Sequence, residues 1–310
     1  MAEKKATRAA YGETLVELLG EGVNVYAVDA DLSGSTTTAK LRAANPAHHL
    51  NVGIAEQNMI GVAAGLSRTG ATVFTGSFAV FGTGRVYDQI RNTVCYAALD
   101  VKIAPTHAGI SVGPDGGSHQ MVEDLALMRV LPNMRVLVPA DYHAAKAAIR
   151  IAAHTPGPFY VRLGRMDVEQ IYPSTSGFEL GRARILRPGK DVSIVACGIE
   201  VALALEAAER LAAEGIEAEV IDAFSLKPLD EETILGSVRK TGFVITAEEH
   251  SVIGGLGSAV AELLAGHPGI LRKPLGRIGV QDRFGTSGDF DELFREYGLD
   301  SQAIYELVVQ

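Results

Sequence analysis

The sequence is poor in cysteine, has no basic excess and has no apolar run long enough to cross a bilayer. Its only cysteines, Cys95 and Cys197, lie far apart and outside any C-x-x-C spacing, which excludes a zinc or disulfide framework and indicates a reducing cytoplasm. A net charge of -9 argues against a nucleic-acid surface. The N-terminal M-A-E-K-K-A-T-R has no apolar run after its charges and does not read as a signal peptide. We therefore expect a cytoplasmic protein that binds neither membrane nor nucleic acid.

What is present is a regular alternation of two kinds of segment. Short β-branched runs, typical of strands, begin at Val23, Ala71, Val101, Arg135, Phe159, Val192, Ala218 and Phe243. Amphipathic, Ala-rich stretches typical of helices lie between most of them, for example from Arg85 to Ala98 and from Tyr142 to Ala153. This alternation predicts an α/β fold of mostly parallel sheets with helices on both faces.

The alternation breaks at two neighbouring places along the chain. Polar turn residues gather near Ser174 to Gly177, and R-P-G-K follows from Arg187. With 310 residues and 47% hydrophobic content, the chain can bury two modest cores. We predict two α/β domains, residues 1–175 and 191–310, joined by a linker at 176–190.

The segment from Asn51, N-V-G-I-A-E-Q-N-M-I-G-V-A-A-G-L, carries a single carboxylate, Glu56, in the first turn of a predicted helix. Acidic residues favour helix N-termini electrostatically, which gives Glu56 an ordinary explanation. Its apolar, Gly-rich surroundings also exclude water from a carboxyl group and suit it to holding or delivering a proton. This segment alone leaves both interpretations open.

Ligands of open parallel sheets bind beyond the carboxyl ends of the strands. Acidic, basic, hydroxyl and aromatic side chains follow the predicted strands of the first domain: Asp29, Asp31, Ser33, Ser35, Glu56, Ser77, Phe78, Phe81, Thr106, His107, Asp115, Ser118, His119 and Arg165. Each has an ordinary role open to it, such as a turn or cap for Asp31 and Ser35, or the core for Phe78 and Phe81. Together they form an enzyme-like set at one sheet edge.

Two features of the second domain favour structure over chemistry. G-G-L-G-S-A from Gly254 faintly suggests a dinucleotide loop, but it lacks the matching acidic residue, so tight helix packing explains it better. Glu248, Glu249 and His250 could form a site, although an interface role suits them better.

The sequence resembles the C-terminal half of transketolase, a pyrimidine-binding domain followed by a C-terminal domain, from about Ala6 to the end. G-I-A-E-Q around Glu56 is similar to the family segment whose glutamate binds the aminopyrimidine of thiamine diphosphate. G-S-F-A-V-F from Gly76 is similar to the segment whose aromatic residues pack on that ring. T-H-A-G-I-S-V-G-P-D-G-G-S-H-Q from Thr106 resembles its substrate loop, and L-P-N-M-R-V-L-V-P-A-D continues the match. These motifs occur in the family's order.

The resemblance implies thiamine diphosphate as cofactor and the transfer of a two-carbon ketol unit from a ketose phosphate to an aldose phosphate. It implies that Glu56 hydrogen-bonds a pyrimidine ring nitrogen and favours the imino tautomer, with His119 as a second catalytic residue. Phe78 and Phe81 would pack on the pyrimidine, and Asp31 would belong to the cofactor side. The implied substrate-binding residues, for sugar hydroxyls and phosphate, are Arg8, Ser35, His107, Asp115, His119 and Arg165.

The chain departs from the family in two ways. Gly84 stands where many transketolases place a third aromatic. The family's G-D-G…N motif, which holds the diphosphate and its metal, is missing, since the Gly288-Asp289 pair is followed by Phe290. We therefore expect no metal ligands here, and an N-terminal partner subunit of similar length that holds Mg²⁺ or Ca²⁺. Two copies of each subunit would form a heterotetramer, and this chain alone would be inactive.

Several other functions remain open from the sequence. The beta subunit of a 2-oxo-acid dehydrogenase has the same pair of domains, and a relative of 1-deoxy-xylulose-5-phosphate synthase would look much like this chain. A non-catalytic structural paralogue is a further alternative, against which the polar residues at the sheet edge argue. A nicotinamide oxidoreductase would rest only on Gly254 to Gly257.

Overall fold

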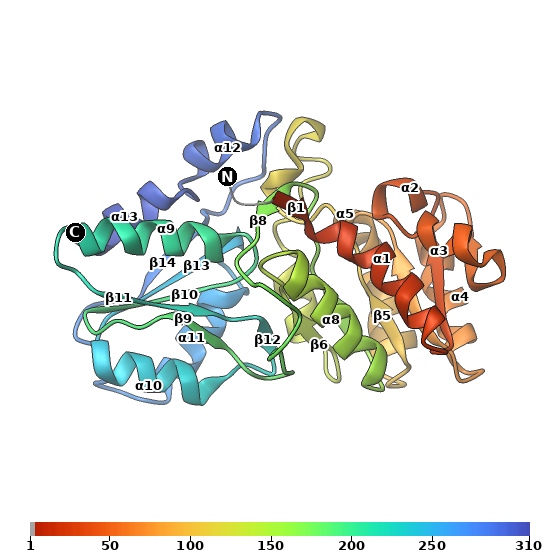
Figure 1. Cartoon of the computed structure of the whole chain (residues 1–310), viewed down its shortest axis with the longest axis horizontal. Helices are drawn as coiled ribbons and strands as arrows, with labels where there is room; N and C mark the ends of the chain where they lie inside the picture. The colour runs from red at the N-terminus through yellow and green to blue at the C-terminus, as the bar shows by residue number, and fades with distance from the viewer. Residues whose placement is uncertain (1–3) are drawn as a thin grey trace.

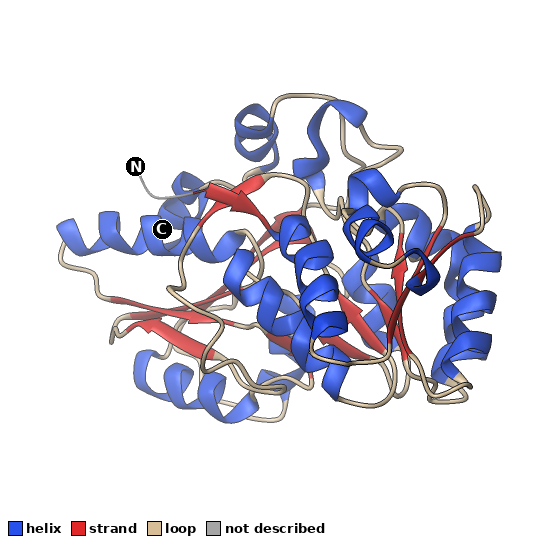
Figure 2. Cartoon of the chain, turned by 45° about the vertical axis from the view of Figure 1, so that its right-hand side comes forward, coloured by secondary structure: helices blue, strands red, loops and turns tan. Residues whose placement is uncertain are grey.

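The computed structural model describes residues 4–310 as two lobes, each built on a sheet (Figure 1). Residues 1–3, where the predicted first domain begins, lie outside the described residues. Helices cover both faces of both sheets (Figure 2), which confirms the predicted architecture. Among residues 4–310, no helix combines the length and apolar character needed to cross a membrane.

The first sheet has seven strands in the order β12-β6-β7-β5-β4-β2-β3 and is parallel except for β12. Its strands are β2 (Val25–Asp29), β3 (His49–Asn51), β4 (Thr72–Gly76), β5 (Val101–Ile103), β6 (Arg135–Leu137), β7 (Phe159–Val161) and β12 (Ser225–Lys227). The runs predicted as strands in this half are all confirmed, because β-branched and aromatic residues suit a sheet that is covered on both faces. β12 comes from the second half of the chain and was not predicted.

The helices of the first lobe include two long ones, α1 and α8, that pack against each other. Asp141 caps α8 by accepting from Ala144 N, and Glu17 of α1 pairs with Lys146 and Arg150 of α8. The helices are α1 (Thr7–Gly20), α2 (Ser33–Thr36), α3 (Ala39–Ala44), η1 (Pro46–His48), α4 (Glu56–Ser67), α5 (Ala79–Gly82), η4 (Ile110–Asp115), α7 (Asp124–Val130) and α8 (Tyr142–His154).

The segment predicted as one helix from Arg85 to Ala98 is helical but divided. It consists of a 3-10 turn η2 (Gly84–Val86), a short α6 (Tyr87–Gln89) and a π-helix η3 (Ile90–Cys95). The change of helix type alters which side chains face the sheet, so the regular helical period expected from sequence is lost here.

The second sheet has the order β14-β13-β10-β11-β9, and only β9 is antiparallel to its neighbour. Its strands are β9 (Arg184–Arg187), β10 (Val192–Ala196), β11 (Ala218–Asp222), β13 (Val244–Ser251) and β14 (Gly276–Val280). Its helices are α9 (Glu200–Ala213), α10 (Glu231–Thr241), α11 (Leu256–Ala265), α12 (Phe290–Tyr297) and α13 (Ser301–Val309). β9 falls within the segment predicted as a linker. β14 escaped prediction because three of its five residues, G-R-I-G-V, are glycine or arginine.

Two buried apolar layers run through both lobes. Phe74 of β4 packs in the layer of α1 and α8, whereas its neighbour Val73 packs in the layer of α4. Successive strand side chains point to opposite faces, and Ile194 and Val195 of β10 separate in the same way. The lobes therefore share one continuous core on each side of the sheets.

A two-stranded antiparallel ribbon lies beside the first sheet. It pairs β1 (Lys4–Ala6) with β8 (Asp167–Glu169), with Ala6 opposite Asp167. Because α1 follows β1 directly and Arg165 precedes β8, the ribbon brings Arg8 close to Arg165.

Candidate active site

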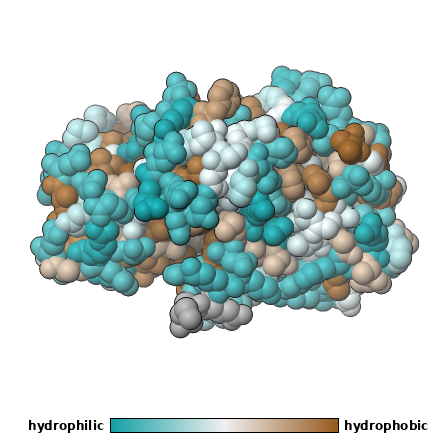
Figure 3. Space-filling model, turned by 90° about the horizontal axis from the view of Figure 1, so that it is seen from above, coloured by the Kyte–Doolittle hydropathy of each residue, from teal (hydrophilic) through white to brown (hydrophobic). Residues whose placement is uncertain are grey.

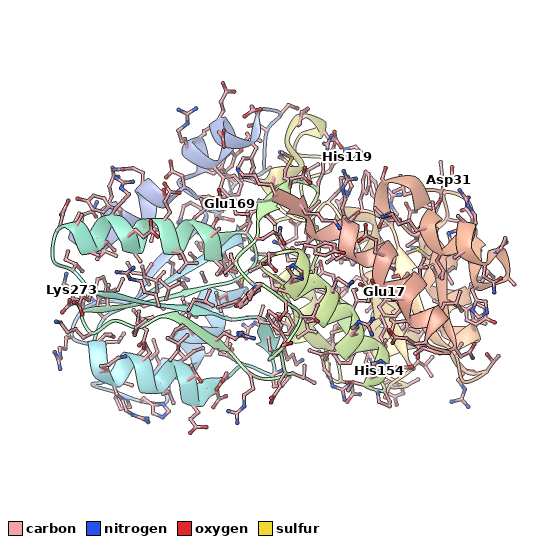
Figure 4. The ribbon with its side chains drawn as sticks, viewed as in Figure 1. Glu17, Asp31, His119, His154, Glu169 and Lys273 are labelled. Atoms are coloured by element: carbon pink, nitrogen blue, oxygen red, sulfur yellow. The ribbon has the colours of Figure 1, made fainter. Side chains whose placement is uncertain are left out.

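The polar residues predicted from the strand ends gather at one edge of the first sheet. Asp31 and His119 lie at the upper edge in Figure 4, whereas His154, the last residue of α8, lies at the opposite edge. Figure 3 looks down on this upper side, on which hydrophilic residues predominate with scattered hydrophobic ones. The parallel strand order explains the gathering, because the carboxyl ends of β2, β4, β5 and β7 all open on this edge.

Glu56 is the first residue of α4 and is only 4% exposed. The peptide dipoles of the helix favour a carboxylate at this end. Its Oε1 accepts a hydrogen bond from Arg85 Nη1 at 2.8 Å. Glu56 thus lies in the first turn of a helix, as predicted, and the structure adds a cation that the sequence did not associate with it.

Two aromatic rings, Phe78 and Phe81, lie next to this ion pair; we call them the aromatic wall. The rings of Phe78 and Phe81 are stacked at 6.2 Å, and the Arg85 guanidinium lies 4.3 Å over the Phe81 ring. Gly84 leaves the neighbouring space open, with Met121 Cε 3.9 Å from the point where a side chain would begin. Arg85 and Met121 thus border the space beside Gly84, the position at which the sequence lacks the third aromatic residue of many transketolases.

His107 closes the other side of the aromatic wall. Its ring stacks on Phe78 with centroids 3.8 Å apart, and its Nδ1 lies 2.7 Å from Thr106 Oγ1. Burial, together with the positive charges of Arg8 and Arg165, lowers the pKa of His107 to about 3. His107 is therefore a neutral imidazole at physiological pH, and its backbone φ of 61° is a rare one for a non-glycine residue.

His119 belongs to the segment 109–119, which we call the glycine loop. It presents its edge to Phe81 at 5.4 Å and to Phe78 at 6.4 Å, while Ser118 Oγ lies 2.9 Å from its Nδ1. The structure thus brings Glu56, both phenylalanines and both histidines into one group.

A second group holds the predicted arginines. Arg8 donates from Nε to the Arg165 carbonyl at 3.1 Å and from Nη1 to the Ser35 carbonyl at 3.0 Å. Arg165 donates from Nη1 to the Val112 carbonyl at 2.7 Å and to Asp115 Oδ1 at 3.1 Å. Both side chains are partly exposed, so their remaining N–H groups can reach an anion.

Asp31 stands apart from these two groups. It is exposed, has a φ of 62°, and accepts from Asn51 Nδ2 at 3.0 Å. Its neighbour Asp29 is fully buried and accepts from Thr38 Oγ1, with His49 Nε2 2.6 Å away. Asp29 thereby shapes the turn that carries Ser35.

The second lobe reaches the same edge through consecutive residues of β13. Glu249 Oε1 accepts from Ser111 N at 2.5 Å, and His250 Nε2 accepts from Leu125 N at 3.1 Å. Glu248 accepts from Leu256 N and Gly257 N at the start of α11. These groups serve packing and the contact between lobes, as the sequence favoured.

The glycines from Gly254 also serve packing. A Cβ on Gly257 would lie 2.9 Å from Thr246 Oγ1, so α11 approaches β13 too closely for a side chain. This is the tight helix packing favoured over a dinucleotide loop.

Comparison with known proteins identifies the class. The family model for the transketolase pyrimidine-binding domain matches residues 3–170, and that for the transketolase C-terminal domain matches residues 181–304. The chain belongs to the transketolase family.

Its extent within the family is that of a C-terminal half. A transketolase C-terminal section from Methanocaldococcus jannaschii is 50% identical over 308 residues, covering 99% of this chain and 96% of that protein. The 6-deoxy-6-sulfo-D-fructose transketolase subunit SqwH from Clostridium sp. is 44% identical over 303 residues, covering 97% of this chain and 93% of the subunit. Human transketolase is 36% identical over 312 residues, but the match covers 49% of the human protein.

The solved structures give the same picture. A split-gene transketolase, solved as an inactive β4 tetramer, superposes with a TM-score of 0.89 at 50% identity, covering 99% of this chain and 98% of that one. The matches favour neither the dehydrogenase subunit nor the synthase relative. The chain has the extent and fold of the C-terminal subunit of a two-part transketolase.

Proposed function

We propose that this chain is the C-terminal subunit of a two-subunit transketolase and carries the pyrimidine and sugar ends of a shared active site. The observation that carries the proposal is the buried Glu56 carboxylate, whose partner Arg85 lies over the face of Phe81. Two-part relatives of matching length, and human transketolase at about twice the length, support it.

The residues present fit the pyrimidine end of thiamine diphosphate. A flat cation already lies on Phe81 and bonds Glu56, so a flat heterocycle with a hydrogen-bonding nitrogen can use the same two groups. Thiamine diphosphate supplies the electron sink for breaking and forming the carbon–carbon bond. Glu56 would hold a proton at the ring nitrogen, and Phe78 and Phe81 would orient the ring. Asp31, exposed beside Asn51, would lie at the outer margin of this end.

The sugar end is formed by the histidines and the arginines. Neutral His107 can donate or accept at a sugar hydroxyl, His119 can move a proton at the reacting oxygen, and Asp115 can accept from a hydroxyl. Arg8 and Arg165, with Ser35, would bind the terminal anion of the sugar. We propose a phosphate, as in the pentose phosphate pathway of the cytoplasm. The relative SqwH, named for a sulfonated sugar, makes sulfonate the alternative.

A partner would supply the rest of the site. Residues 4–310 contain no cluster of His, Cys, Asp or Glu suited to a metal ion, so the diphosphate and its Mg²⁺ or Ca²⁺ would be held by an N-terminal subunit. Two copies of each subunit would form a heterotetramer. The β4 tetramer of the split-gene relative, described as inactive, is consistent with a C-terminal subunit that needs its partner.

Reconstitution tests the proposal. The purified chain should transfer no ketol unit by itself, and adding the N-terminal subunit with thiamine diphosphate and Mg²⁺ should restore transfer from xylulose 5-phosphate to ribose 5-phosphate. Pyruvate with glyceraldehyde 3-phosphate serves as the control pair and should give no product. Transfer by the chain alone would refute the two-subunit assignment, and activity only with pyruvate would refute ketol transfer.

A further inference from the structure

A loop of the second lobe lies directly against the glycine loop. We call residues 283–288, between β14 and α12, the clasp loop. A Cβ on Gly117 would collide with the Gly285 carbonyl, and one on Gly116 would lie 2.5 Å from Ser287 Oγ. Gly113 has more room, because its Cβ position would lie 3.4 Å from the Gly288 carbonyl oxygen, an ordinary van der Waals contact. Gly116 and Gly117 therefore allow the two loops to approach more closely than a side chain at either position would permit.

Gln120 joins the two loops through one buried amide. It is 4% exposed, and its Nε2 lies within hydrogen-bond distance of three carbonyl oxygens: Ile110 at 3.2 Å, Gly113 at 3.3 Å and Thr286 at 2.9 Å. Its Oε1 occupies the space that a side chain on Gly285 would need. Gln120 therefore fixes the distance between the glycine loop and the clasp loop.

The clasp loop is itself anchored to the second lobe. Tyr297 Oη donates to the Phe284 carbonyl at 2.9 Å, and the Arg283 guanidinium lies 3.8 Å over the Tyr297 ring. Tyr297 ends α12, which packs on η4 at the top of Figure 1. The bond from Ser111 N to Glu249 holds the other end of η4 to β13. The glycine loop is thus held at two points by the second lobe.

We propose that the second lobe sets the position of the glycine loop for sugar binding, and that Gln120 is the positioning residue. This inference rests on the proposed function, in which Asp115 and His119 of the glycine loop contact the sugar. A displaced loop moves both side chains relative to the sugar. It leaves Glu56 on α4 and Phe81 on α5 in place, so sugar binding and cofactor binding should respond differently.

Gln120→Ala tests the proposal, with Gln281→Ala as the matched control. Gln281 lies just before the clasp loop, and its Nε2 donates to the Gly279 carbonyl at 3.0 Å, away from the glycine loop. In the chain alone, Gln120→Ala should speed amide hydrogen exchange within residues 110–119 and Gln281→Ala should not. In the assembled enzyme, Gln120→Ala should raise the KM for the sugars about tenfold, since it removes the hydrogen bonds from Nε2 that hold the glycine loop. The Kd for thiamine diphosphate should stay unchanged.

Gly285→Ala tests the same contact from the side of the clasp loop. Because this loop is largely exposed, the substitution is not expected to unfold the protein. Its added methyl group would displace Gln120, so the single variant should also raise the sugar KM. Added to Gln120→Ala, it should have little further effect, because the group it displaces is gone.

Three results would overturn the proposal: unchanged exchange in the glycine loop of Gln120→Ala, unchanged sugar KM, or an equal loss of thiamine diphosphate affinity. Additive effects of the two substitutions would overturn the coupling. If the assembled wild-type enzyme transfers no ketol unit, the proposed function fails, while the exchange experiment still decides whether Gln120 positions the loop.

Discussion

The guanidinium of Arg85 pairs with Glu56 at 2.8 Å and covers the ring of Phe81 at 4.3 Å. These are the two groups that the proposed function assigns to the pyrimidine of the cofactor. A half-exposed arginine therefore neutralises a buried carboxylate and occupies an aromatic face that a ligand would need.

Replacing Arg85 by Met should lower the stability of the free chain without weakening cofactor binding to the assembled enzyme. Loss of the Arg85 cation leaves the buried Glu56 carboxylate unpaired, which should lower the free energy of unfolding of the chain by about 1 kcal/mol. The value is small because Arg85 is half exposed. Urea denaturation measures this change, and calorimetry should find that thiamine diphosphate binds the assembled enzyme at least as tightly as before. Arg91→Met, in the adjacent π-helix, serves as the control. Weaker cofactor binding in Arg85→Met would instead mean that the arginine packs on the bound cofactor.

Replacing Glu56 by Gln should separate catalysis from assembly. An amide keeps the shape of the carboxylate but cannot hold a proton at the ring nitrogen, so kcat should fall by about 10²-fold or more. Size-exclusion chromatography with the partner should give an unchanged complex. Glu17→Gln on α1, a partly exposed carboxylate far from the sheet edge, should leave kcat unaltered. A normal kcat in Glu56→Gln would exclude the assigned role.

Arg165→Ala tests the anion end of the sugar site. Loss of a charged hydrogen bond of about 1.5–3 kcal/mol should raise the KM of phosphorylated sugars by about tenfold or more. The KM of unphosphorylated sugars should change less, because only the contacts through Val112 and Asp115 are disturbed. An equal effect on both kinds of sugar would remove Arg165 from the anion site. Arg150→Ala on α8 provides the surface control.

His107 should make the chain sensitive to acid. Its pKa is lowered to about 3 in the folded chain, against about 6.5 when unfolded, so the unfolded state takes up the proton first. The stability that depends on a neutral His107 is complete above pH 6.5 and is lost as the pH falls toward 3. His107→Asn, which tolerates the positive φ, should show a smaller drop in Tm between pH 7 and pH 4 than the wild type. Parallel Tm curves for the two proteins would contradict the buried, neutral imidazole.

The sequence predicted the parts of the site that local patterns encode. Glu56 was found because it is a lone acidic residue at the start of an apolar helix. The aromatic and histidine group was found from the residues that follow each strand, because parallel strands bring their carboxyl ends together. The ion pair with Arg85 was not predictable, since it depends on the change from a 3-10 turn to a π-helix between residues 84 and 95.

Contacts between distant segments escaped prediction for a different reason. Gln120 and Thr286 are 166 residues apart, and neither lies in a pattern that indicates the other. β12 is a strand of three residues whose pairing with β6 depends on how the second half of the chain returns to the first. The proposed roles of the individual site residues, and the division at 176–190, stay predictions.

The pairing of β12 with β6 bears on how the protein can be dissected. A fragment ending near residue 175 would lack β12 and would leave the N–H and C=O groups of β6 unpaired along an open sheet edge. Such an edge can pair with another chain, so this fragment would be prone to self-association and precipitation. The smallest piece suited to expression as a well-behaved protein is consequently the pair of lobes together. Fusion tags or interaction screens based on one lobe would report the behaviour of an exposed strand instead of the native surface.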